Sequence, residues 1–250
     1  MADDLVYLVR PGNRNEELRW SLRSVEVNMP GRRVWIVGHK PDWLTGVEHI
    51  PTRQEGHKHQ NTLANLAAAC EHEEVSEKFV LFNDDFFVLQ PLGEVPVLHR
   101  GTLNEFIERY RRPHVGAELG WWRRAVETRK SLAMLGHDPD MALSYELHVP
   151  LPMCRETWLA GVRELQRIGR YEIRYWTKRS FYGNFAGLGG RRCDDVKIAD
   201  DKAWERAGAA AGVTSWTFLS TADGAFNYGR VGRWLRRQFP DRCRFERRGP

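Results

Sequence analysis

The chain has 250 residues, of which 42% are hydrophobic and 28% are charged. This composition is typical of one large globular unit and excludes extensive disorder. No basic segment followed by an apolar stretch of signal length opens the chain, and no apolar run approaches the roughly 20 residues of a membrane span. We therefore expect a soluble, cytoplasmic protein with no membrane span. The 4 cysteines lie far apart, which gives a zinc site or a disulfide framework little support.

The formal net charge of +5 is unevenly distributed, because arginines crowd the end of the chain. Such a segment could bind nucleic acid, an anionic polymer or the phosphates of a nucleotide, or it could be a solvated basic face. From Arg242 to Pro250 we expect a frayed basic tail.

Alternating strands and helices are predicted for the first part of the chain. Apolar runs at residues 5–9 and 34–37 indicate buried strands, and residues 48–51 indicate a brief third strand. Between the first two runs, Asn15 marks the start of a helix that should stop before Pro30. Strand, helix and strand at this spacing predict a parallel crossover.

A polar run, residues 52–61, precedes a second predicted helix from Asn61 to Cys70. The run contains His57 and His59, but no carboxylate or cysteine stands at metal-ligand spacing around them. A structural metal site in this loop is therefore poorly supported.

Two adjacent carboxylates, Asp84 and Asp85, follow directly on the short apolar run Phe79–Phe82 and Asn83. A run of this kind suits a central strand covered on both faces, and unpaired carboxylates cannot lie in such a core. We expect the strand to end at Asn83 and to present both carboxylates at its carboxyl edge, where a divalent cation and a phosphate-bearing ligand would meet. The alternative is a simple turn that uses side-chain hydrogen bonds of the Asn-Asp-Asp sequence.

Several of these segments together resemble the Stealth proteins, which are sugar-1-phosphate transferases of bacterial capsule synthesis and of lysosomal enzyme tagging. Residues 14–25, followed by 33–37 and 42–44, look like the second conserved region of that family. Residues 60–65 are similar to its asparagine-rich helix start. Residues 82–87, with the sequence FNDDFF, match its most specific motif almost letter for letter.

The resemblance continues in the second half of the chain. His148–Pro152 resembles the third region of the family, whose histidine is implicated in catalysis. Thr177–Asn184 resembles the arginine-bearing segment that follows, and Phe239–Glu246 resembles the end of the fourth region.

Two segments depart from the pattern of the family. The first region normally opens with a strand that ends in a Trp-Val-Asp-Gly type of sequence, whereas Tyr7–Gly12 lacks the aspartate and Asn13 is the nearest polar substitute. The fourth region normally carries an Asn-Asp pair, and the corresponding stretch here is Thr221–Asn227. The transferred group therefore stays open between sugar-1-phosphate and sugar.

The resemblance implies an α/β fold, as a single GT-A-like, Rossmann-like domain over residues 1–250. It would have a mostly parallel central sheet flanked by helices, with a helical insertion or lid at residues 91–144. The resemblance further implies a nucleotide-sugar donor, a divalent cation (Mg²⁺ or Mn²⁺) on Asp84 and Asp85, and catalytic roles for Asp85, His148 and Arg179. The residues that it places around the substrates are Arg10, Asn13, Arg14, Arg19, Asn61, Asn65, Lys178, Asn184, Asp223 and Asn227.

The insertion is expected to contain helices at residues 102–110 and 121–135. Trp121 and Trp122 could stack on a sugar or a base, with the two following arginines holding phosphate. Alternatively, both tryptophans belong to the core or to a hinge.

Tyr145–His148 is strand-like and would place Glu146 and His148 on one face. A histidine at a strand end can take a proton from an incoming hydroxyl near neutral pH. A buried, hydrogen-bonded structural histidine is the alternative.

The remaining elements are predicted as a helix, a glycine-rich loop, a late strand and a last helix. Asp194–Asp195 between them could be a further cation ligand or a helix N-cap. The ranges are 154–168 for the first helix, 187–190 for the loop, 217–219 for the strand and 225–238 for the last helix.

The sequence therefore predicts a metal-assisted transferase that moves a sugar-1-phosphate, or a sugar, from a nucleotide sugar onto a hydroxyl of a polymeric acceptor. The acceptor could be a glycan, a protein or DNA. Two other classes stay open, namely a nuclease or phosphatase that uses the paired carboxylates and a non-catalytic binder of nucleic acid or glycan.

Overall fold

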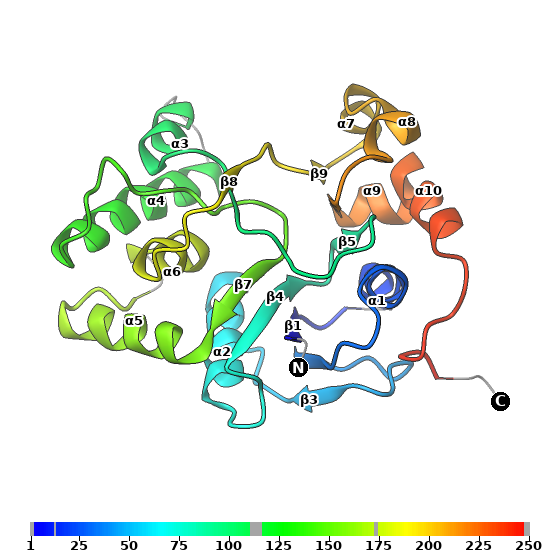
Figure 1. The fold of residues 1–250 in the computed structure, drawn as a ribbon, viewed down its shortest axis with the longest axis horizontal. Helices are drawn as coiled ribbons and strands as arrows, with labels where there is room; N and C mark the ends of the chain where they lie inside the picture. Colours follow the sequence, from blue (N-terminus) through cyan, green and yellow to red (C-terminus); the bar gives the residue numbers. More distant parts are fainter. Residues whose placement is uncertain (1–2, 13, 111–116, 173–174, 248–250) are drawn as a thin grey trace.

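A five-stranded sheet forms the centre of the molecule (Figure 1). The computed structural model describes residues 3–12, 14–110, 117–172 and 175–247. The strand order is β3-β2-β1-β4-β7; the first four strands run parallel and β7 is antiparallel to β4 at one edge. The strands are β1 (Asp4–Val9), β2 (Val34–Gly38), β3 (Glu48–Ile50), β4 (Lys78–Asn83) and β7 (Leu151–Cys154).

Two hydrophobic cores cover the two faces of this sheet, and the central strands contribute apolar side chains to both cores. Successive side chains of a strand point to opposite faces. In β1, Val6 and Leu8 therefore enter one hydrophobic core, while Leu5, Tyr7 and Val9 enter the other. The predicted α/β class with a mostly parallel central sheet is confirmed.

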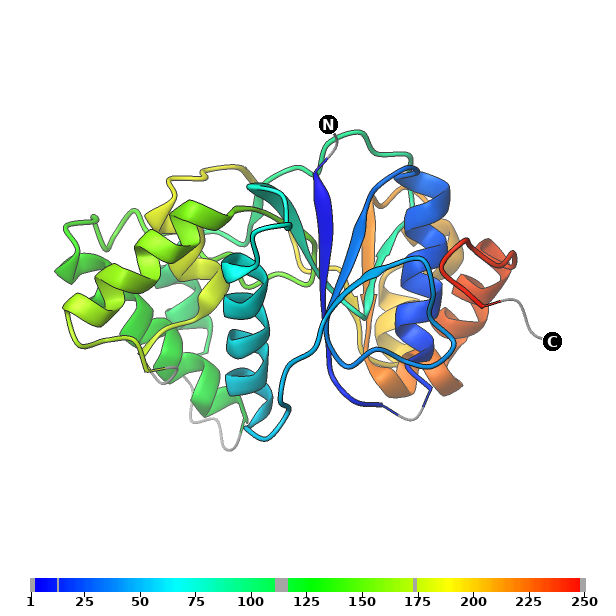
Figure 2. The same cartoon turned by 90° about the horizontal axis from the view of Figure 1, so that it is seen from below.

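Two layers of helices cover the two faces (Figure 2). The helices on one side are α2 (Lys58–Glu71), α4 (Ala117–Met134), α5 (Arg155–Arg167) and α6 (Lys178–Phe185). Those on the other side are α1 (Glu16–Asn28), α9 (Asp223–Tyr228) and α10 (Arg230–Gln238).

Smaller elements extend this frame beside the carboxyl end of β4. The chain turns at Asp84 and Asp85 and continues as β5, which joins β10 and β9 in a second sheet. The further elements are β5 (Phe86–Val88), β6 (Leu98–His99), α3 (Leu103–Arg109), β8 (Arg191–Arg192), β9 (Lys197–Ile198), α7 (Asp201–Arg206), α8 (Ala209–Val213) and β10 (Phe218–Thr221). No helix among the described residues combines the length and the apolarity that crossing a bilayer requires.

The strand expected at Tyr145–His148 is wrong, since this segment is irregular and β7 begins only at Leu151. Its backbone groups bond to side chains instead of to a neighbouring strand. The N–H of Tyr145 donates to the Ser180 hydroxyl, and the N–H of His148 donates to the Asp195 carboxylate. Side chains from segments distant in sequence thus take the place of strand-to-strand hydrogen bonds.

The frayed tail expected from Arg242 is also wrong as far as residue 247. Cys243 and Phe245 are buried, and the Glu246 carboxylate pairs with the Arg23 guanidinium of α1 at 2.7 and 2.9 Å. The last predicted helix is divided into α9 and α10, because Gly229 between them has an extended backbone.

Candidate active site

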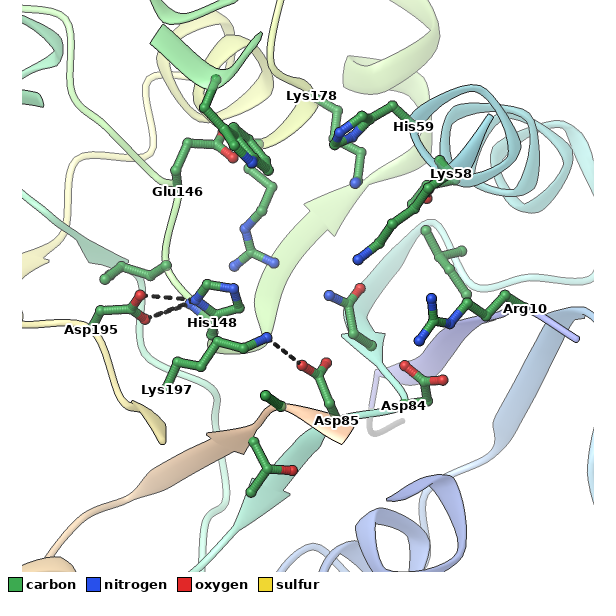
Figure 3. Close-up of a pocket in the computed structure, with 18 of the residues that line it drawn as sticks. Arg10, Lys58, His59, Asp84, Asp85, Glu146, His148, Lys178, Asp195 and Lys197 are labelled. Carbon is green, nitrogen blue, oxygen red and sulfur yellow. Dashed lines mark hydrogen bonds and ion pairs between the residues drawn. The ribbon is translucent and has the colours of Figure 1, made fainter. Parts of the chain in front are cut away.

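A cavity of about 720 Å³ lies at the carboxyl ends of β1 and β4 (Figure 3). Arg10 follows β1, and Asp84 and Asp85 follow β4, so the parallel strands bring these side chains to one edge of the sheet. Ligands of open α/β sheets bind at this edge. The opposite wall is formed by the start of α2, the start of α6 and the segment that contains His148.

The two carboxylates have different surroundings. Oδ2 of Asp85 accepts hydrogen bonds from Nζ of Lys197 at 3.1 Å and from Oγ of Ser220 at 3.0 Å. The Asp84 carboxylate lies beside Arg10 (Figure 3). Burial, and the charge of Asp85 next to it, raise the pKa of Asp84 to about 6. Asp84 and Asp85 thus occupy the turn after β4, and both line the cavity.

Glu17, in the first turn of α1, also lines the cavity. Its Oε1 accepts a hydrogen bond of 2.6 Å from the Thr221 hydroxyl. Burial raises the pKa of Glu17 to about 8, and the nearby charges of Asp85 and Asp84 act in the same direction. Glu17 is therefore mostly protonated near neutral pH. In the sequence it stands out only as an acidic residue at a helix start.

His148 is held by Asp195 through both its ring and its backbone. Nδ1 of His148 lies 3.1 and 2.9 Å from the two oxygens of Asp195, and Oδ1 also accepts from the backbone N–H at 3.0 Å. Burial alone would raise the pKa of Asp195, but its contacts with His148 and the charge of Arg100 lower it. An ionised Asp195 accepts a hydrogen bond from the Nδ1–H of His148, and in this tautomer Nε2 is the ring nitrogen that can act as a base.

Asp195 was expected to be a further cation ligand or a helix N-cap, and the N-cap is wrong because no helix starts there. Its carboxylate bonds to His148 and to the N–H of Val196, ahead of the short strand β9. No spacing rule joins residues 148 and 195, so the sequence carried no signal for this pair.

Arg179 lies in the cavity wall with most of its surface buried. Its Nε donates to the carbonyl of Tyr145 at 3.0 Å, and Nη2 donates to the carbonyl of Val149. These two bonds anchor both ends of the segment that presents His148. The observed contacts of Arg179 therefore position the histidine.

The structure brings nine of the predicted site residues to this cavity. They are Arg10, Asn61, Asn65, Asp84, Asp85, His148, Lys178, Arg179 and Asp223. Asn65 is 3% exposed, and its Nδ2 donates to the carbonyl of Val37, so its observed contacts support the sheet edge. Asn13 lies outside the described residues.

Four predicted site residues are absent from the described cavity lining: Arg14, Arg19, Asn184 and Asn227. The guanidinium of Arg19 stacks on Trp43 at 4.4 Å, and Asn184 bonds to both backbone groups of Leu143. Asn227 donates to Asp223, which does line the cavity. The observed contacts of these last three side chains are structural.

Two carboxylates at one edge of the cavity fit a divalent cation that takes its other ligands from phosphate and water. Mg²⁺ is usually held in this way, by one or two carboxylates together with substrate phosphates. Within the described residues, no group of three or more His, Cys, Asp or Glu side chains could enclose a metal without such help. Asp84 and Asp85 therefore suit a cation that arrives with a phosphorylated ligand.

Neither a family model nor a curated protein matches this sequence. Among solved structures, an active-site mutant of LgtC is similar over 96% of this chain and 98% of its own, with a TM-score of 0.51 and 11% identity. The galactosyltransferase LgtC in complex with donor and acceptor sugar analogs is similar over 94% and 93%, with a TM-score of 0.50 and 11% identity. The Stealth resemblance stays a prediction, and the chain has the fold of the GT-A glycosyltransferases.

Proposed function

We propose that this protein is a nucleotide-sugar-dependent glycosyltransferase that moves a sugar onto a hydroxyl of a polymeric acceptor and releases a nucleoside diphosphate. One observation carries the proposal: Asp84 and Asp85 share a cavity with the His148–Asp195 pair at the carboxyl edge of the central sheet. The fold agrees with it, since LgtC, which is described as a galactosyltransferase, binds donor and acceptor sugar analogs.

The carboxylate side of the cavity would bind the diphosphate of the donor. A divalent cation, Mg²⁺ or Mn²⁺, would be held by Asp84 and Asp85 and would neutralise the charge of the leaving diphosphate. Arg10 lies beside Asp84 and supplies a second positive charge there. Lys197 and Ser220 fix the orientation of Asp85 through their hydrogen bonds.

His148 would act as the general base. Its Nε2 removes the proton of the acceptor hydroxyl, and Asp195 stabilises the imidazolium that results. The hydroxyl oxygen then bonds to the anomeric carbon of the donor, while the bond from that carbon to the phosphate oxygen breaks. The proton stays on His148 and the electron pair leaves with the diphosphate.

The sequence FNDDFF favours a second reaction, the transfer of sugar-1-phosphate. In that case the acceptor oxygen attacks the phosphorus that bears the sugar, and a nucleoside monophosphate leaves. The same carboxylates and the same histidine would serve both reactions, so the nucleotide released distinguishes them.

Residues 91–144 would form the acceptor-side lid of this enzyme. The segment contains β6, α3 and α4. Phe106 and Tyr110 of its α3 region and Trp121 of α4 contribute apolar surface to the cavity wall. Aromatic surface of this kind suits the apolar face of a sugar ring.

Turnover of a panel of UDP-, GDP- and CDP-sugars, with Mg²⁺ or Mn²⁺ and mixed glycan, protein and DNA acceptors, tests the proposal. Release of a nucleoside diphosphate supports glycosyl transfer, and release of a monophosphate supports transfer of sugar-1-phosphate. If no donor in the panel is consumed, the proposal fails and a non-catalytic binder is favoured.

A further inference from the structure

A small recess leads off the main cavity on the side away from the carboxylate pair. Its volume is about 20 Å³, which is room for roughly one small polar group. It shares His59, Trp121, Glu146 and Lys178 with the main cavity and adds Arg124 of α4 to the lining. In Figure 3, Lys178 and His59 lie across the pocket from Asp84 and Asp85. We call this end of the cavity the basic recess and add to it Lys58, which precedes His59 in α2 and lines the adjoining part of the main cavity.

Positive charge exceeds negative charge in the basic recess. Lys58 and Lys178 direct their amines into the pocket (Figure 3), and neither amine has an ion pair within the part of the chain that the structure describes. Glu146 is the carboxylate that borders the recess, and it already accepts hydrogen bonds from the N–H and the hydroxyl of Ser180, at 3.1 and 2.9 Å. Glu146 is therefore one carboxylate that acts on both Lys178 and Arg124, while the charge of Lys58 acts on Asp84.

Burial makes this excess of charge unfavourable. It lowers the pKa of Lys178 to about 8, and it also lowers the pKa of the Arg124 guanidinium. His59 supplies no negative charge. Its Nε2 already accepts a hydrogen bond from Nη2 of Arg124, at 3.2 Å, because a guanidinium can only donate. Two half-buried cations that share one carboxylate are costly unless a ligand supplies a second anion.

Trp121 gives the basic recess an aromatic surface with a fixed orientation. The Arg124 guanidinium stacks over its ring at 4.8 Å, and the His59 ring meets it edge-on at 5.3 Å and 90°. A tryptophan held on two sides is a rigid surface for the apolar face of a sugar ring. A sugar ring on Trp121 and an anionic group near the lysines could therefore belong to one ligand.

From this arrangement we infer that the basic recess is an acceptor subsite for a sugar that carries an anionic substituent, either a carboxylate or a phosphate. This inference rests on the proposed function, since the donor diphosphate is assigned to the other side of the cavity, at Asp84 and Asp85. The anionic group would contact Lys58 and Lys178, and the sugar ring would stack on Trp121.

Calorimetric titration of the whole protein with glucose 6-phosphate, glucuronate and glucose tests the subsite, with and without UDP and Mn²⁺. At least one charged sugar should bind about tenfold or more tightly than glucose, as expected for one charge-assisted hydrogen bond. The two charged sugars distinguish a phosphate from a carboxylate. Lys178→Met and Lys58→Met should each abolish the preference, and Lys58 is exposed, so its replacement does not threaten folding. Lys202→Met, at an exposed site outside the cavity, should retain it.

Equal binding of the three sugars, or binding of none, would overturn the inference. So would a Lys178→Met variant that loses affinity for UDP and Mn²⁺ while it keeps the preference for charged sugars, because the lysine would then belong to the donor site. Failure of the proposed function looks different: the wild type would bind neither UDP nor GDP nor CDP with a cation, whatever its affinity for charged sugars.

Discussion

Asp195 fixes both the position and the tautomer of His148, since it accepts from the backbone N–H and from Nδ1. Arg179 fixes the same segment from the other side through the carbonyls of Tyr145 and Val149. The imidazole is therefore held before any substrate binds. At the scale of single residues, this rigid orientation is what a general base requires.

Replacement of His148 by alanine should lower turnover by about 100-fold or more, because the acceptor hydroxyl would lose its base. Affinity for the donor should stay unchanged, since the diphosphate is assigned to the carboxylates. Initial rates and donor titration by calorimetry measure the two effects separately. Asp195→Asn should also lower turnover, and His137→Ala, outside the cavity, should not. A His148→Ala variant with normal turnover would remove the base from the mechanism.

The charge of Lys178 makes the binding of anionic sugars dependent on pH. Its pKa is lowered to about 8 by burial, so its amine is charged below that pH and loses its charge as the pH rises through it. Affinity for glucose 6-phosphate or glucuronate should therefore fall above about pH 8, while affinity for glucose stays flat. The charged groups that face the amine are Glu146, Arg179, Lys58 and Arg124.

Titrations at several pH values between about 6 and 10 measure this dependence on the charge of the amine. The Lys178→Met variant should show a smaller decline over the same range. A decline of equal size in wild type and variant would assign the pH effect to another group.

The site residues could be predicted only where a local pattern or the family resemblance marks them. Asp84 and Asp85 end an apolar run, and a run of that kind places its polar successors at the sheet edge. Asp195 and Glu17 reach the site through tertiary packing, across many residues of intervening chain. Such contacts depend on the packing of whole elements and leave no short-range signal in the sequence.

At the scale of elements, the helix α6 depends on a close approach to Tyr145. A Cβ built on Gly183 would lie 2.4 Å from ring carbons of Tyr145, so the helix can pack there only because residue 183 has no side chain. Tyr145 opens the segment that contains His148. The position of the base therefore depends on this glycine.

Gly183→Ala should destabilise the protein by about 1–3 kcal/mol through overpacking and should also lower turnover. Gly120→Ala is the matched control, since a Cβ on Gly120 of α4 would approach the Arg124 side chain at an ordinary 3.5 Å. That change should be neutral or slightly stabilising in a helix. Urea unfolding measures both variants, and equal midpoints for the two would contradict the packing argument.

Elements with a strong period were predictable, and irregular segments were not. The apolar runs of β1, β2 and β4 bury both faces and stand out without any tertiary information. The segment Tyr145–His148 has a strand-like composition, but Ser180 and Asp195 provide its hydrogen-bond partners. Propensity alone does not contain those partners.

At the scale of the whole molecule, the end of the chain is fastened to its beginning. The Arg23 guanidinium of α1 forms two hydrogen bonds with Glu246 and donates to the carbonyls of Phe239 and Pro240. Both charged side chains are nearly fully buried, at 8% and 2% exposure. The arginine-rich composition of this segment suggested a free tail, because composition does not show which charges are paired.

Arg23→Met should therefore cost about 2–3 kcal/mol of folding free energy, since the buried Glu246 then keeps only the longer contact with Arg19, at 3.4 Å, among the cations of the described structure. Arg167→Met removes an exposed ion pair with Glu164 and should leave the unfolding midpoint almost unchanged. Urea unfolding followed by circular dichroism compares the two. An Arg23→Met protein as stable as the wild type would mean that the C-terminal segment does not support the fold.

In the proposed mechanism, Asp84 and Asp85 bind the donor diphosphate through a divalent cation. Calorimetric titration with UDP, GDP and CDP, with Mn²⁺ and then with a chelator, measures whether they do. The wild type should bind at least one of these nucleotides only when the cation is present, and Asp85→Asn should weaken that binding by about tenfold or more. Asp42→Asn, at an exposed site outside the cavity, should bind like the wild type. Equal affinity with and without the cation, or an Asp85→Asn variant that binds as tightly as the wild type, would contradict the account.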